Sequence, residues 1–119
     1  MVDFLSAEWF SALNEALARA GTPPLGDHDV LRVVLEFSDG PKSVPHAMTF
    51  TVSAKGAVGE PGDHLAADAV VRLTYDDAVA LTLGALESGV ALREGRLKVR
   101  GDVQALVPFL EWLLESHAA

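Results

Sequence analysis

Several stretches of the chain alternate between apolar and polar residues with a period of two. This spacing sends successive side chains to opposite faces, so it is typical of strands with one buried face. Two shorter stretches are apolar, and the one at 69–73 is rich in β-branched residues, which favour strands. We therefore predict five strands, at residues 30–38, 44–54, 57–59, 69–73 and 95–101.

Three other stretches repeat apolar residues every three or four positions, which is the spacing of one helix face. Local signals mark their ends. Ser6 and Asp102 are N-cap residues, Thr74 can form a capping box with Asp77 three residues later, and Gly21 is placed to stop a helix. We predict helices at residues 6–20, from 75 to about 88, and 103–116.

The order of these elements predicts an α+β fold. It runs α-β-β-β-β-α-β-α, with helices covering a five-stranded sheet, and the length fits one domain over residues 1–119. Gly84 lies inside the second predicted helix, where glycine costs about 1 kcal/mol relative to alanine. That cost suggests that another part of the chain packs closely against Gly84.

The composition narrows the possible functions. Half of the residues are hydrophobic, so we expect a folded core. The net charge of −8 disfavours nucleic acid as a partner, because phosphate binding needs clustered Lys and Arg. The absence of cysteine excludes disulfides and thiol chemistry. No apolar run approaches the ~18 residues of a transmembrane helix.

Neither end of the sequence resembles a targeting signal. The N-terminal stretch carries Asp3 and Glu8 but no basic leader. The last residues, 116–119, differ from the peroxisomal address Ser-Lys-Leu. We therefore expect a cytoplasmic protein.

No sequence motif indicates catalytic chemistry. The serines lie outside any Gly-x-Ser-x-Gly elbow, and the four histidines form no His-Glu-x-x-His pattern. We expect no catalytic residue, no metal and no cofactor. His28, which stands between two aspartates, is expected in a solvent-exposed loop. An enzyme would need a buried pair made by His46 with Tyr75 or Asp68, and this alternative stays open.

The region from residue 67 to 102 resembles the sterol carrier protein 2 family. That family has Ala-Asp before an apolar strand, then Gly-x-Leu, an alanine seven residues after that glycine, and Gly-Lys-Leu-x-x-x-Gly followed by Asp or Asn. The matching positions are Ala67-Asp68, Gly84-Ala85-Leu86, Ala91, Gly95-Arg96-Leu97 and Gly101-Asp102. Arg96 replaces the usual lysine, and Glu87-Ser88 replaces the Asp-Pro that often follows Gly-x-Leu.

The resemblance implies a mixed sheet, an apolar tunnel between sheet and helices, and a small bacterial-type protein. It also implies non-catalytic binding and carriage of a lipid, such as a fatty acid, fatty acyl-CoA, isoprenoid or sterol. Arg93 and Arg96 are the candidates for contact with its head group, unless their basic cluster is only a solvated surface. The candidate tunnel residues are Leu83, Leu86, Val90, Leu92, Leu106, Phe109, Leu110 and Leu113.

A second hypothesis is an accessory or dimerisation module that works beside an enzyme and has no ligand of its own. The partner would then be a second copy or a client enzyme. The last predicted helix carries Phe109 and Trp112 on a second side, which makes its apolar face broad. The direction of these two side chains distinguishes the hypotheses, because a partner surface would leave them exposed.

Overall fold

The computed structural model describes residues 3–117, so residues 118 and 119, the last two of the C-terminal stretch considered above, lie outside it. A five-stranded mixed sheet with the strand order β3-β2-β1-β4-β5 confirms the predicted α+β fold. The elements are α1 (Ala7–Arg19), β1 (Val30–Ser38), β2 (Ala47–Ser53), β3 (Gly56–Pro61), β4 (Ala69–Thr74), α2 (Tyr75–Thr82), α3 (Ser88–Arg93), β5 (Lys98–Gly101) and α4 (Val103–His117).

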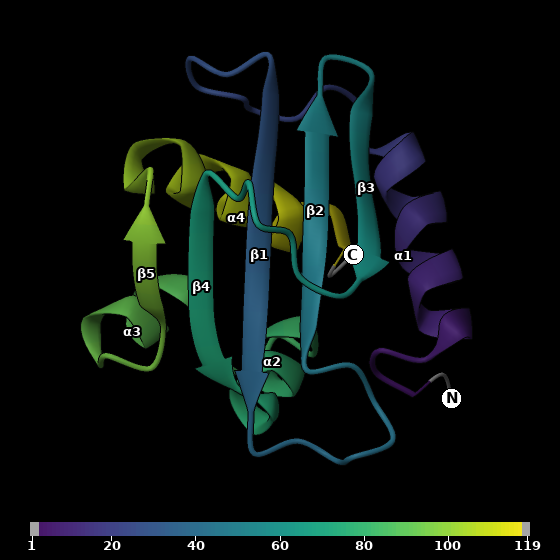
Figure 1. Ribbon diagram of the computed structural model, residues 1–119, viewed down its shortest axis with the longest axis vertical. Helices are drawn as coiled ribbons and strands as arrows, with labels where there is room; N and C mark the ends of the chain where they lie inside the picture. Colours follow the sequence, from purple (N-terminus) through teal and green to yellow (C-terminus); the bar gives the residue numbers. More distant parts are fainter. Residues whose placement is uncertain (1–2, 118–119) are drawn as a thin grey trace.

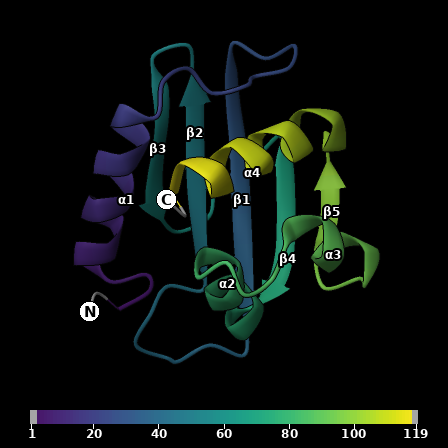
Figure 2. The ribbon, with the colours of Figure 1, turned by 180° about the vertical axis from the view of Figure 1, so that it is seen from behind.

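The central strand β1 pairs antiparallel with β2 and parallel with β4. The parallel pairing requires a crossover between β3 and β4, which passes over the face of the sheet opposite to α4 (Figure 1). Gly62 anchors the crossover, because its N–H donates to Ala47 O and its carbonyl accepts from Thr49 Oγ1, both at 2.8 Å. The other face of the sheet carries α2 and α4 (Figure 2).

The core lies between the sheet and these helices. Alternate positions of each strand point into it, as the period-two pattern predicted, and they meet the apolar side of α4. Phe50 and Phe109 have no more than 2% of their surface exposed and contact each other edge to face, with ring centroids 5.4 Å apart.

Helix α1 covers the free edge of β3 (Figure 1). The Asn14 side chain pairs with the Gly59 backbone: Nδ2 donates to the carbonyl at 3.0 Å, and Oδ1 accepts from the N–H at 2.8 Å. A Cβ on Gly59 would lie 2.9 Å from Leu13 Cδ2, so glycine lets the helix approach. The exposed backbone of an edge strand is thereby satisfied inside the molecule.

The end of α2 corrects one prediction. The helix begins at the predicted cap, where Thr74 Oγ1 accepts from Asp77 N at 3.0 Å, but it ends at Thr82. Gly84 follows with φ +76°, and Gly84 N and Ala85 N donate to Leu81 O and Ala80 O. These are the two bonds of a Schellman motif, which requires a left-handed residue. A Cβ on Gly84 would meet nothing within 4 Å, so the predicted close packing there is wrong.

A short helix, α3, was not predicted. It ends in the same way as α2, with Gly95 at φ +74° and Arg96 N donating to Ala91 O. The predicted strand at 95–101 is therefore shortened to β5, because its first residues belong to the helix stop. Gly101, at φ +94°, is the glycine that needs close approach: a Cβ there would collide with Asp68 O and lie 2.9 Å from Ala69 Cα.

Candidate functional site

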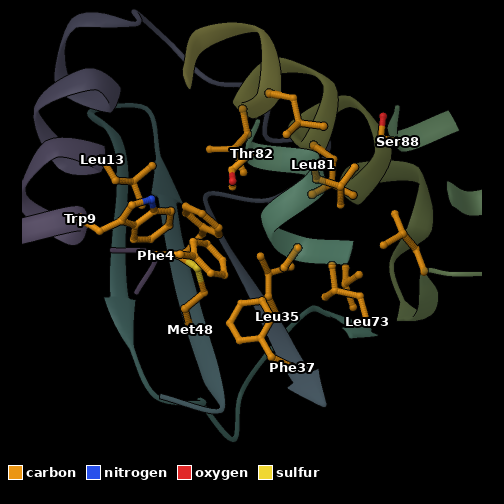
Figure 3. Close-up of a pocket in the computed structure, with 17 residues that line it drawn as sticks. Phe4, Trp9, Leu13, Leu35, Phe37, Met48, Leu73, Leu81, Thr82 and Ser88 are labelled. Atoms are coloured by element: carbon orange, nitrogen blue, oxygen red, sulfur yellow. The ribbon is translucent and has the colours of Figure 1, made fainter. Parts of the chain in front are cut away.

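An apolar cavity of about 70 Å³ lies between the sheet, α1, α2 and α4 (Figure 3). Among the described residues that line it, Thr82 and Ser88 are the only polar ones. The lining residues are Phe4, Trp9, Leu13, Leu35, Phe37, Met48, Phe50, Val71, Leu73, Ala78, Leu81, Thr82, Ser88, Leu97, Leu110, Leu113 and Leu114.

Strand β1 and helix α4 supply lining residues from opposite sides of the cavity. Leu35 and Phe37 are two residues apart on β1, so both point to the helix side of the sheet. Leu110 and Leu113 are three residues apart on α4 and face them from the other side. The cavity therefore lies where the inner face of the sheet meets the apolar face of the last helix.

Phe4, which precedes α1, lines the cavity and packs against three other aromatic rings. Its ring centroid lies 4.8 Å from that of Trp9, 5.8 Å from that of Phe37 and 5.5 Å from that of Tyr75. Ring contacts of this kind each add about 0.5–1.5 kcal/mol to the burial of the side chains. They hold the segment before α1 across the cavity.

The cavity can hold apolar groups and offers no acid, base or nucleophile pair for a reaction. Its volume is well below the ~300–1,000 Å³ of a site that encloses a whole small molecule. A long chain would therefore enter only if side chains at the boundary move apart. Leu81, Ser88 and Leu114 are half-buried boundary residues that also line a groove of about 380 Å³ on the surface.

The eight residues predicted to line a tunnel occupy different places. Leu110 and Leu113 line the cavity, and Leu86 lines the neighbouring groove. Leu106 and Phe109 are completely buried in the core without lining the cavity. The remaining three are the half-buried Val90 and Leu92 and the 67% exposed Leu83.

The two predicted head-group residues lie away from the cavity lining. Arg93 is exposed on α3. Arg96 lines a surface cleft, and its guanidinium lies 3.2 Å from Glu94 Oε1 and 3.8 Å from Asp77 Oδ1. Contact of either residue with a lipid head stays a prediction.

Sequence reasoning missed the contribution of the first half of the chain. Phe4, Trp9 and Leu35 line the cavity together with α4, although they lie far from it in sequence. The alternation on the strands and the helical spacing in α1 did mark most of these residues as inward-facing. Neither pattern shows which inward positions surround a void, because that depends on how the helices pack.

His28 is not the exposed loop residue that was predicted. Its Nε2 donates to Asp102 Oδ2 at 2.7 Å, its Nδ1 lies 3.8 Å from Asp68 Oδ1, and 24% of the side chain is exposed. Both carboxylates also accept backbone hydrogen bonds, from Arg32 N and Ala105 N. The cluster thus joins the segment before β1 to the starts of β4 and α4.

The cluster shifts the pKa values of two of its members. The hydrogen bond to Asp102 raises the pKa of His28 above 6.5, and the charges of Asp68, Asp102 and Asp27 act in the same direction. The same hydrogen bond, followed by that from Ala105 N, lowers the pKa of Asp102 below 3.8. None of these residues lines the cavity.

The enzyme alternative receives no support from His46. This residue is exposed and precedes β2, whereas Asp68 precedes β4. Since β2 is antiparallel and β4 parallel to β1, the two residues lie at opposite ends of the sheet. Within residues 3–117, no group of three or more His, Asp or Glu is arranged to hold a metal ion.

The whole mixed sheet lies within a stretch of the chain that matches a known family. The SCP-2 sterol transfer family matches residues 24–109, and the chain belongs to this family. A search of curated proteins gives no match. Among residues 3–117, no helix has both the length and the apolarity to cross a membrane.

Solved structures with the same fold share little sequence with the chain. A conserved hypothetical protein from Thermus thermophilus, described as possibly a sterol carrier protein, has a TM-score of 0.68 and 20% identity, covering 99% of this chain and 90% of its own. Sterol carrier protein 2 from Yarrowia lipolytica has a TM-score of 0.64 and 17% identity, and the match covers 100% of this chain and 98% of that protein. The UbiJ-SCP2 ubiquinone synthesis protein has a TM-score of 0.65 and 19% identity, and the match covers 98% of this chain and 96% of that protein. At these identities the likeness shows the fold alone.

Proposed function

We propose that this protein binds and carries a long-chain lipid, without catalysing a reaction, by taking the chain into the cavity under α4. The observation that carries the proposal is the lining of that cavity, which is apolar except for Thr82 and Ser88 at one side. Family membership supports the same function. The candidate lipids are those named above: fatty acid, fatty acyl-CoA, isoprenoid or sterol.

The binding energy would come from burial of the chain. Each buried methylene contributes about 0.8 kcal/mol and micromolar binding corresponds to about 8 kcal/mol, so a chain of about ten or more buried methylenes is needed. Because the cavity measures only about 70 Å³, it would first take the end of the chain. The rest would follow the groove beyond Leu81 and Leu114, which must separate as the chain enters.

The first test is native mass spectrometry of freshly purified protein, with organic extraction and lipid analysis. Near-stoichiometric lipid that a fluorescent long-chain probe displaces would support the proposal. A protein that carries no lipid and takes up no fluorescent fatty acid, fatty alcohol or acyl-CoA would overturn it.

A filled cavity should weaken this uptake. Ala78 lies on α2 with its side chain at the cavity, so Ala78→Leu would occupy the void, and Leu113→Trp would do so from α4. The matched control is Leu65→Trp, because Leu65 is fully exposed on the crossover. We expect probe uptake to fall at least tenfold in the two cavity variants, which is about 1.4 kcal/mol. Circular dichroism would show that both remain folded.

The partner-module hypothesis has weaker support. Phe109 is completely buried and Trp112 is half-buried, stacked on Phe109 with ring centroids 6.0 Å apart. The aromatic side of α4 therefore packs largely on the core, which leaves little of it for contact with a partner. A homodimer or a client enzyme stays a prediction, which size-exclusion chromatography with light scattering and pull-down from the native host would test.

A further inference from the structure

A groove on the surface lies directly beside the cavity and shares half-buried lining residues with it. It runs between the α2–α3 connection and α4 and measures about 380 Å³. Leu81, Ser88 and Leu114 line both spaces. A lipid whose chain end lies in the cavity would therefore leave its head group in this groove.

The rim of the groove is acidic. Glu87 approaches from the α2–α3 connection, and Glu111 and Glu115 lie one turn apart on the same side of α4. All three are exposed, and the described part of the groove lining contains no Lys or Arg. No ion pair within residues 3–117 involves these glutamates.

A basic cleft on another part of the surface is a poorer exit. It measures about 610 Å³ and contains Arg72, Arg96 and Lys98. Arg72 already pairs with Glu36 at 2.8 Å, and Arg96 pairs with Asp77 and Glu94. The two residues that line both this cleft and the cavity, Phe37 and Leu73, are only 7% and 6% exposed, whereas those shared with the groove are half-buried.

We propose that the site selects a single-chain lipid whose head group donates hydrogen bonds and carries no negative charge, a hydroxyl or an ammonium. This inference rests on the proposed function. Ionised carboxylates only accept hydrogen bonds, so Glu87, Glu111 and Glu115 complement a donor head. A carboxylate or phosphate head would meet three like charges in the groove.

The test compares three lipids with the same chain and different heads: dodecanoate, dodecanol and dodecylamine. Each displaces an uncharged fluorescent long-chain probe at low salt and mildly alkaline pH, where dodecanoate is ionised. The variant is Glu87→Gln/Glu111→Gln/Glu115→Gln. The matched control, Glu15→Gln/Glu60→Gln/Asp63→Asn, removes the same charge at exposed positions outside the groove and the cavity.

The unaltered protein should bind dodecanol and dodecylamine roughly tenfold more tightly than dodecanoate, because each exposed like charge costs a severalfold factor. In the groove variant dodecanoate should gain roughly tenfold and dodecylamine should lose a similar factor, while dodecanol changes by less than about twofold. The control should keep the original order of the three lipids. Added salt should reduce the preference.

Equal binding of dodecanoate and dodecanol by the unaltered protein would overturn this inference and leave the proposed function in place. An unchanged preference in the groove variant would also overturn the inference, and would favour the basic cleft as the place of the head group. If the protein bound none of the three lipids and no probe, the proposed function itself would fail. The two failures are therefore distinguishable.

Discussion

His28 Nε2 lies 2.7 Å from Asp102 Oδ2, although 74 residues separate the two in sequence. Asp102 also caps α4, since its Oδ1 accepts from Ala105 N at 3.1 Å. A single carboxylate thus fixes the start of the helix that roofs the cavity and ties it to the segment before β1.

The pair should make stability depend on pH. Because the pKa of His28 is raised in the folded protein, its contribution to stability is fully present below pH 6.5. That contribution is lost as the pH rises through the raised pKa of the folded protein. The lowered pKa of Asp102 means that its contribution is present above 3.8 and is lost as pH falls through the lower folded value. The pair therefore stabilises the folded protein most between pH 3.8 and pH 6.5.

Thermal unfolding of His28→Gln at a series of pH values would measure this effect. The loss of melting temperature relative to the unaltered protein should be largest in that window and should shrink toward alkaline pH. His46→Gln is the control, because His46 is exposed. A loss for His28→Gln that is constant with pH would contradict the charge-dependent account.

Gly84 and Gly101 should respond differently to alanine. Both have positive φ, so each substitution costs about 1–2 kcal/mol of left-handed strain. Gly84→Ala should lower the free energy of unfolding by only this amount, because nothing lies within 4 Å of the new methyl group. Gly101→Ala should cost at least about 3 kcal/mol, since the methyl group would also collide with the backbone at Asp68. Urea unfolding of both variants tests the ranking, and equal losses would contradict it.

Asn14→Leu should destabilise the edge of the sheet by about 2 kcal/mol. The substitution keeps the shape of the side chain but removes two hydrogen bonds to Gly59, each worth about 1 kcal/mol. Asn14→Asp keeps the acceptor for Gly59 N–H but turns a second acceptor toward the Gly59 carbonyl, so it should lose at least about 1 kcal/mol. Urea unfolding gives the free energies, and amide exchange at Gly59 should speed up only in Asn14→Leu.

Phe109 and Leu83 were both predicted from sequence to line a tunnel, but their substitution by alanine should have very different effects on stability. Phe109→Ala should cost about 3–5 kcal/mol, because the ring is fully buried against Phe50. Leu83→Ala should change stability by less than about 0.5 kcal/mol, since 67% of the side chain is exposed. Thermal or urea unfolding tests both, and a large loss at Leu83 would show that the loop packs differently in solution.

Local patterns predicted most of the fold. The alternation in β1 gave its bounds, and the caps at Ser6, Thr74 and Asp102 marked the starts of three helices. These signals succeed because caps and strand alternation depend on neighbours a few residues away. Gly84 was misplaced because a glycine inside a helix and a glycine that ends one look alike until the backbone conformation is known.

The sequence by itself determined the α+β fold, the family and the apolar character of the inward faces, since these follow from residue type and spacing. Only the tertiary structure decided that Phe4 and Leu35 share a cavity with Leu110, that His28 pairs with Asp102, and that three glutamates border the groove. Each of these depends on how distant segments pack together: β1 against α4, the segment before β1 against the start of α4, and the α2–α3 connection against α4. Such contacts between distant segments leave no periodic signal in a single sequence.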